Sequence, residues 1–115
     1  MLTVKGLRCA ILLLIMTCFY PQAAPAESFK SADFLTWKRD TQDFYIEASV
    51  GMASLIATQN DRTQAKCIDD WYYTDEAAAN AFVLSVMRDH PTYHPRGIIL
   101  GVVQKQCGSF KNGEG

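Results

Sequence analysis

This sequence predicts a small all-α fold, a bundle of about four helices with one disulfide that follows a cleaved N-terminal signal peptide. Apolar residues recur at helical spacing in several stretches, and no stretch shows the strict alternation of a strand. The N-terminus has the composition of an export signal, and only two cysteines follow it. No repeat or interdomain linker is visible, so we expect a single domain.

The first 26 residues resemble a secretory signal peptide. Two basic residues precede the apolar run 9–20, and small residues lead to Ala26. As a helix this run spans about 18 Å, which is too short for a hydrocarbon core of about 30 Å. We therefore expect residues 1–26 to be removed and residues 27–115 to form a periplasmic domain that is not anchored in the membrane.

The charge of the mature chain argues against a nucleic-acid partner. Of the 11 lysines and arginines, two lie in the signal peptide, which leaves nine against 12 acidic residues and a net charge of about −3. Binding to nucleic acid requires a basic patch or stripe, and none is present.

Cys67 and Cys107 are the cysteines that remain after export. In an oxidising compartment, two cysteines most simply form one disulfide. Closing a loop of about 40 residues is expected to stabilise the domain by about 4 kcal/mol on the chain-entropy model. We therefore assign this pair a structural role.

The first two helices are expected over residues 28–40, with Ser31 as the N-cap, and over 42–58, with Thr41 as the N-cap. Gly51 lies inside the second helix, where glycine costs about 1 kcal/mol relative to alanine. We interpret it as a site of close helix–helix approach. The second helix is expected to bury one set of residues, Phe44, Ala48, Val50 or Gly51, and Leu55, together with an offset set, Tyr45, Met52 and Ile56.

The remaining helices follow a polar turn at 60–66 and a connecting segment at 67–76. Thr74 is expected to cap a helix over 75–90, which Pro91 ends. Pro95 suits the first turn of a last helix over 95–107, with Gly108 as its C-terminal cap. The first of these helices is expected to bury Ala78, Ala81, Phe82, Leu84, Ser85 or Val86, and Met87. The last helix is expected to bury Ile98, Ile99, Val102 and Val103.

His90 and His94 are four residues apart and could share a metal ion only on an unbroken helix. Pro91 and Pro95 interrupt that helix, so we expect a tight corner in which an imidazole bonds a free carbonyl at the end of the preceding helix. A zinc site that adds both mature cysteines would require reduced thiols in an oxidising compartment. We expect no metal and no cofactor.

No arrangement typical of an enzyme is present. The serines lack a nucleophile-elbow motif, no glycine loop could hold a phosphate, and no cysteine stays free once the disulfide forms. Carboxylates adjacent in sequence point apart. We therefore expect a protein without enzymatic activity.

The segment CIDDWYYTDE is the strongest candidate for partner binding. It places Trp71, Tyr72 and Tyr73 beside Asp69 and Asp70, and three adjacent aromatic residues in a connecting segment cannot all face one small core. Exposed aromatic residues with a charged rim are typical of interaction hot spots. In the alternative interpretation, Trp71 covers the disulfide, one tyrosine fills the core and the acids are solvated.

The mature chain resembles the Rap/Tai family, the immunity proteins against peptidoglycan-amidase toxins of type VI secretion. The similarity lies in the order of several short motifs. These are DFL at 33–35, F-x6-G from Phe44 to Gly51, Cys67, VMRDHPTYHP at 86–95, and IILGVVQKQC ending at Cys107.

The chain departs from the family pattern at two places. Lys38 and Tyr45 stand where the family has a further cysteine pair, and Lys105-Gln106 precede the last cysteine where the family has Phe-Pro. The resemblance implies a periplasmic inhibitor, often a homodimer, that occludes the toxin's cleft with a protruding loop. We identify residues 68–76 as that loop.

Two other functions fit the same sequence. A small periplasmic chaperone of the acid-stress Hde type is also helical, exported and held by one disulfide. It would lose structure and expose apolar surface as its carboxylates are protonated. An accessory binding subunit of an envelope complex is the third possibility.

Overall fold

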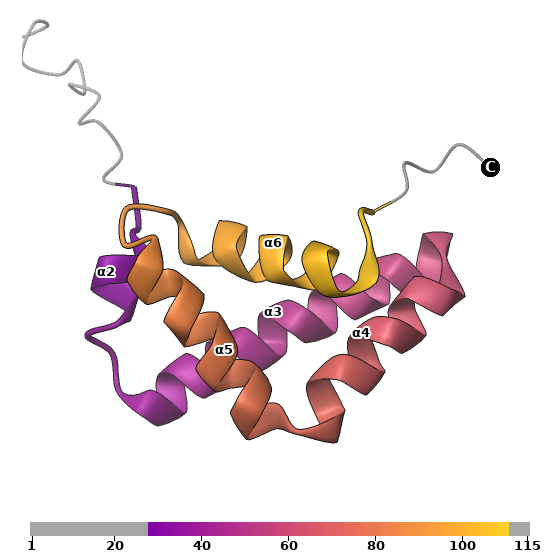
Figure 1. Cartoon of the computed structure of the whole chain (residues 1–115), viewed down its shortest axis with the longest axis horizontal. Helices are drawn as coiled ribbons and strands as arrows, with labels where there is room; N and C mark the ends of the chain where they lie inside the picture. Colours follow the sequence, from indigo (N-terminus) through magenta and orange to yellow (C-terminus); the bar gives the residue numbers. More distant parts are fainter. Residues whose placement is uncertain (1–27, 111–115) are drawn as a thin grey trace, which may run out of the picture.

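Five helices make up residues 28–110, the part of the chain that the computed structural model describes (Figure 1). This part contains no strand, so the predicted all-helical fold class is confirmed. The predicted signal peptide, residues 1–26, lies outside the described range. The helices are α2 (Ser31–Phe34), α3 (Arg39–Asn60), α4 (Arg62–Thr74), α5 (Glu76–Asp89) and α6 (Pro95–Cys107).

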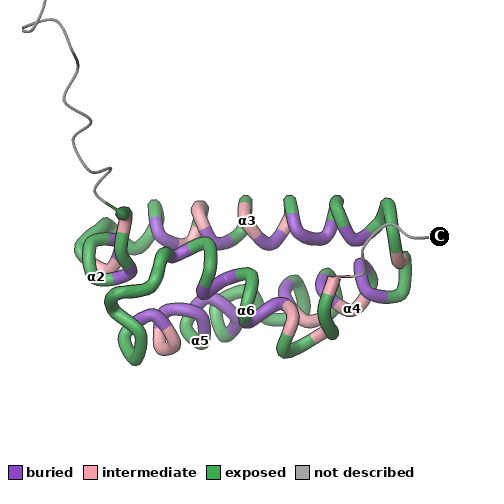
Figure 2. Tube along the Cα trace, turned by 90° about the horizontal axis from the view of Figure 1, so that it is seen from above, coloured by how far each residue is buried: buried purple, intermediate pink, exposed green. Residues whose placement is uncertain are grey.

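The core lies between α3 and the other long helices, and Figure 2 shows the buried positions of α3 on the side that faces them. Each of these helices contributes apolar side chains with no exposed area. They include Ile46 and Val50 from α3, Ile68 from α4, Val83 from α5 and Val103 from α6. Burying such side chains stabilises the fold by about 1.5–3 kcal/mol each before entropy is counted.

The buried face of α3 agrees with the predicted one only in part. Val50 is buried as predicted, together with Ile46, Ala53 and Ala57, whereas most of the large residues of the predicted face lie in solvent. Apolar residues cover much of the circumference of α3, so helical spacing alone does not select a face. The small alanines of the observed face allow close approach of the packed helices. The exposed large residues are Phe44 at 71%, Met52 at 58%, Leu55 at 58% and Ile56 at 49%.

Helix α4 replaces the turn predicted at 60–66 and most of the connecting segment predicted at 67–76. A single residue, Asp61, separates it from α3, and the Asp61 side chain accepts hydrogen bonds from the backbone N–H groups of Thr63 and Gln64. The polar residues that suggested a turn are therefore an N-cap and the first turn of a helix. Ala65, Ile68 and Tyr72 form its buried stripe.

Helix α5 begins one residue later than predicted. Asp75, rather than Thr74, is the N-cap, because its side chain accepts a hydrogen bond from the backbone N–H of Ala78. The face that α5 buries agrees with the predicted one in part: Leu84 and Met87 are buried as predicted, whereas Phe82 is 43% exposed. The buried residues are Ala79, Asn80, Val83, Leu84 and Met87.

Helix α6 agrees with its prediction. It runs from Pro95 to Cys107 with proline in the first turn, and Gly108 follows it with a positive φ of 89°. A positive φ favours glycine, which has no Cβ to clash with the backbone. The four predicted apolar residues are all buried: Ile98, Ile99, Val102 and Val103.

The segment at the start of the described chain forms one helical turn, α2, where a longer helix over 28–40 was predicted. Ser31 does not cap it, since Lys30 occupies that position. Ser31 is instead fully buried, and its backbone N–H and its hydroxyl both donate to the carbonyl of Tyr93, at 2.8 and 2.7 Å. This turn therefore fastens the start of the domain to the α5–α6 corner.

The disulfide between Cys67 and Cys107 is present as predicted and joins α4 to the last residue of α6. Close to it, the Gln64 side-chain amide donates to the carbonyl of Gly108 at 2.7 Å, so two interactions hold the end of α6 against α4. A disulfide of this kind is typical of an oxidising compartment. None of the described helices combines the length and the apolar character that crossing a bilayer requires.

Candidate protein-binding face

The five residues predicted to bind a partner lie in the last turns of α4, immediately before the α4–α5 corner, and not in a loop. That corner lies at the lower edge of the molecule in Figure 1. The three aromatic side chains differ in burial. Trp71 is half-buried, Tyr72 is fully buried and Tyr73 is 48% exposed. The expectation that at least one of them is exposed is confirmed.

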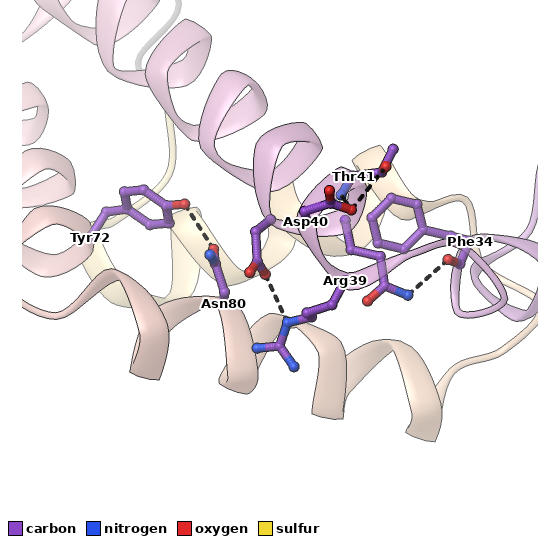
Figure 3. A network of polar contacts seen from close by, with 8 residues as sticks. Phe34, Arg39, Asp40, Thr41, Tyr72 and Asn80 are labelled. Carbon is purple, nitrogen blue, oxygen red and sulfur yellow. Dashed lines mark hydrogen bonds and ion pairs between the residues drawn. The ribbon is translucent and has the colours of Figure 1, made fainter.

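Tyr72 belongs to the core. Its hydroxyl donates to the side-chain oxygen of Asn80 on α5 at 2.8 Å, and both residues are buried (Figure 3). Burial raises the pKa of the Tyr72 hydroxyl to about 12, because a buried phenolate would be poorly solvated. Tyr72 therefore joins α4 to α5 and presents no surface to a partner.

Tyr73 extends from α4 toward α3. A Cβ added to Gly51 of α3 would lie 3.8 Å from the Tyr73 hydroxyl oxygen, which is ordinary van der Waals contact. Gly51 thus lies at a contact between two helices, as predicted, but the space would accept a methyl group. Burial against this helix raises the pKa of the Tyr73 hydroxyl, and the charges of Glu47, Asp69 and Glu76 raise it further.

Carboxylates from three helices are therefore near enough to the half-exposed Tyr73 for their charges to act on its hydroxyl. We define the acidic face as Tyr73 with Glu47 of α3, Asp69 of α4 and Glu76 of α5. Next to it, a shallow hollow of about 480 Å³ is lined by Asp40 and Asp43, two further acids of α3, and also by Glu47 and Glu76.

Several polar contacts hold the carboxylates of this region in place. Asp69 accepts a hydrogen bond from the hydroxyl of Ser54 on α3 at 2.6 Å. Asp43 forms an exposed ion pair with Arg39 at 2.9 Å, and Asp40 accepts from the backbone N–H of Thr41, as Figure 3 shows for Asp40 and Arg39.

Asp70 pairs with Lys66 one helical turn before it, and both side chains are largely exposed. An exposed pair of this kind contributes little to stability. Of the predicted residues, Asp69 and Tyr73 thus belong to the acidic face. Asp70 lies beside them in sequence with its charge already paired.

Glu47 and Glu76 complete the acidic face. Glu76 is the last residue of the predicted loop 68–76 but was not among the five residues singled out for partner binding, and Glu47 carried no motif and was not predicted. Their contribution depends on the packing of α3 and α5 beside α4, which places three charges near one hydroxyl. No local sequence signal encodes that proximity.

The two histidines form a corner, as predicted. His90 ends α5 and His94 caps α6, where its imidazole Nδ1 accepts the backbone N–H of Arg96 at 3.1 Å. The predicted bond from an imidazole to a carbonyl of the preceding helix is not formed within residues 28–110. His94 also packs edge-to-face on Phe29, with ring centroids 5.5 Å apart.

The zinc alternative is contradicted by the disulfide, since both thiols are consumed by the bond between them. Within residues 28–110, no three histidine, cysteine or acidic side chains are grouped so that they could hold a metal ion.

Comparisons of this chain with protein-family models, with curated proteins and with solved structures give no match. The resemblance to the Rap/Tai family therefore stays a prediction that depends on the motifs quoted above.

Proposed function

We propose that this chain is a periplasmic immunity protein that binds and inhibits a peptidoglycan-amidase toxin of type VI secretion. The observation that carries the proposal is the acidic face, in which the half-exposed Tyr73 lies near carboxylates of three helices, two of which, Glu47 and Glu76, also line one hollow. An aromatic side chain within a charged rim is the composition of a binding hot spot. The resemblance of the sequence to the immunity family supplies the class of partner.

The proposed mode of inhibition differs from the insertion of a flexible loop. Asp69 and Tyr73 belong to a helix that the disulfide joins to α6, and Asp69 is further held by Ser54 of α3. Side chains on such a support lose little conformational freedom on binding, which favours affinity. The helical corner itself covers the toxin's cleft.

The charge of the face determines the expected chemistry of the partner surface. Glu47, Asp69 and Glu76 form no ion pair with a basic residue of the described chain. They are available to lysines and arginines of a partner, so we expect a toxin with a basic rim around its active site. Complementary charge mainly increases the association rate and makes it sensitive to salt.

The decisive experiment measures binding and inhibition with purified type VI amidase toxins, beginning with any encoded beside this gene. Glu47→Lys and Tyr73→Ala are the test variants. Asp89→Lys is the matched control, because it makes the same charge change as Glu47→Lys at an exposed position. Asp89 lies about 20 Å along α5 from Glu76 of the acidic face.

We expect the native chain to abolish peptidoglycan hydrolysis at a stoichiometric ratio. Each test variant should bind at least about tenfold more weakly, a loss of about 1.4 kcal/mol, while the control binds normally. Equal binding of all three variants would exclude the acidic face as the site. The absence of inhibition across the amidase class would exclude the function.

The chaperone alternative makes a different prediction at low pH. An acid-stress chaperone should lose helical structure at pH 2–3, bind an apolar dye and suppress aggregation of a client protein. An immunity protein needs none of these properties. Circular dichroism, dye binding and a client-aggregation assay on the same preparation therefore separate the two functions.

A further inference from the structure

The side chain of Phe44 on α3 lies between two hollows of the molecular surface. One is the hollow of about 480 Å³ beside the acidic face, which we call the acidic hollow. The other is an apolar groove of about 730 Å³ between α3 and α6. Phe44 lines both, and it is 71% exposed, more than any other large apolar side chain of residues 28–110. The two hollows therefore form one continuous surface that is joined at an aromatic ring.

The α3 wall of the groove is a straight apolar ridge. Phe44, Ala48, Met52 and Ile56 are spaced by four residues and lie one above another on the helix. From Phe44 to Ile56 the ridge rises about 18 Å, which is slightly more than three turns. Met52 is 58% exposed and Ile56 is 49% exposed. A continuous apolar surface of this kind marks an interaction site more often than isolated exposed residues do.

The acidic hollow places negative charge at one end of this ridge. Four carboxylates line it, those of Asp40, Asp43, Glu47 and Glu76, and no basic side chain of the described residues does. Asp43 forms an ion pair with Arg39, whereas the other three acids form none within residues 28–110. Carboxylates gathered in this way create a negative potential that attracts a cation.

The groove contributes little charge of its own. Arg96 is the one charged side chain among the described residues that line it, and its guanidinium lies 5.9 Å from the centre of the Tyr45 ring. Taken together, the two linings hold four acids and one base, which is a net charge of −3. A partner that is complementary to the whole surface is therefore apolar along most of its length and basic at the end that lies over the acidic hollow.

We propose that the toxin bound by the acidic face also covers Phe44, with a segment in which a lysine or arginine lies next to a row of apolar side chains. The basic side chain enters the acidic hollow, where the Phe44 ring offers it a cation–π contact, and the apolar row lies against the α3 ridge. Phe44 is the central anchor, as aromatic residues are in binding hot spots. This inference rests on the proposed function for the identity of the partner, and the acidic face is continuous with the hollow through Glu47 and Glu76.

Two other occupants fit this surface less well. A second copy that applied the same surface would supply one arginine, Arg96, for the four acids that it meets. Residues 1–26 place Lys5 and Arg8 before an apolar run, but this segment is predicted to be removed on export. We therefore assign the surface of the mature chain to a separate protein.

Two synthetic peptides test this surface on the disulfide-bonded mature chain without the toxin. Both are about 15 residues long, a length at which isolated helices begin to form, and they share one stripe of leucines. They differ at one end, which carries lysines in one peptide and glutamates in the other. By fluorescence anisotropy, we expect the lysine peptide to bind at least about tenfold more tightly and to lose this preference at high salt.

Substitutions separate the parts of the surface. Phe44→Ala should weaken the lysine peptide at least about tenfold, whereas Phe82→Ala, the matched control on α5 that lines neither hollow, should not. Met52→Ser should weaken both peptides by the same factor. Glu47→Gln combined with Glu76→Gln should remove the preference for the lysine peptide. Because Phe44 and Met52 are mostly exposed, the fold should tolerate these changes, and circular dichroism checks that it does.

The same variants in the toxin assay distinguish this inference from the proposed function. Phe44→Ala and Met52→Ser should weaken the binding of an inhibited amidase as Tyr73→Ala does. If only Tyr73→Ala weakens it, the toxin does not cover the ridge, and the inference fails while the function stands. If no amidase is inhibited but the lysine peptide binds as expected, the function fails and the surface takes a basic, apolar segment of another protein.

Three further results would overturn the proposal. Equal affinity for both peptides, or none, would mean that the acidic hollow and the ridge do not act as one site. Self-association by sedimentation that Met52→Ser abolishes would assign the ridge to a second copy. Binding of the lysine peptide to the mature chain but not to the full chain would assign the surface to residues 1–26.

Discussion

Removing the Cys67–Cys107 disulfide should cost this domain a large part of its stability. The bond closes a loop with a sequence separation of 40 residues. The chain-entropy relation gives about 13 cal/mol/K for a loop of that length, which is about 4 kcal/mol at 25 °C. For a domain of this size the loss corresponds to a decrease in Tm of about 15–30 °C. Total stabilities of small domains are about 5–15 kcal/mol, so the variant should be close to unfolding at 37 °C.

The assay is urea denaturation of the mature chain followed by far-ultraviolet circular dichroism. It compares the native protein, the Cys67→Ser/Cys107→Ser variant, and each of them with a reductant. Reductant should lower the midpoint of the native protein to that of the variant and leave the variant unchanged. A difference below about 1 kcal/mol would refute the reasoning, because it would mean that the ends of α4 and α6 are held together equally well by contacts such as Gln64 to Gly108.

Three further changes test individual features of the fold. Because the folded-state pKa of Tyr72 is raised to about 12, its contribution is complete below pH 10 and is lost as the pH rises from 10 to 12. Tyr72→Phe should therefore flatten the decrease of urea stability over that range, and an unchanged slope would contradict the assigned pKa. Asp75→Ala should cost about 1 kcal/mol by removing the α5 N-cap, whereas Thr74→Ala should cost less. If thermal denaturation shows that Thr74→Ala destabilises the domain more than Asp75→Ala, then Thr74 is the cap. Gly101→Ala should stabilise α6 by about 0.5–1 kcal/mol, since the added Cβ meets no neighbour. A lower Tm would contradict the open space around Gly101.

The features that the sequence predicted correctly depend on signals within a few residues of each other. Pro95 at the start of α6 and Gly108 at its end act on the backbone directly, through a fixed φ and a positive φ. Pro91 and Pro95 likewise separate the two histidines whatever the rest of the chain does. The disulfide followed from counting the cysteines beyond the predicted signal peptide.

The errors in the predicted elements arose where the same local residues are compatible with two different structures. Asp61 with the polar residues after it can begin a turn or cap a helix, and Tyr72 can line a connector or fill a core. Only the packing of Ile68 and Tyr72 against the rest of the core decides for the helix. The candidate site shows the same limit. Asp69 and Tyr73 were identified from their own segment, but Glu47 lies 26 positions before Tyr73 and joins it only through the fold.

The orientation of α3 shows why helical periodicity alone does not identify the buried face of a helix. Turning this helix to bury Phe44, Met52 and Ile56 would hide more apolar area, yet the structure buries Gln42 and Ser54 instead. Both polar side chains bond other parts of the chain. The Gln42 amide donates to the carbonyl of Phe34 at 3.0 Å, and the Ser54 hydroxyl donates to Asp69 at 2.6 Å.

Rotating α3 would break both of these bonds, and each loss would cost stability. It would take the Gln42 amide away from the carbonyl of the buried Phe34 and would remove the Ser54 hydroxyl from the exposed Asp69. It would also place a bulky ridge where small residues now let neighbouring helices approach. The observed register therefore follows from long-range hydrogen bonds and close packing, and an exposed apolar ridge is its consequence. A surface that the fold leaves apolar for this reason gains its hydrophobic free energy only when another molecule covers it.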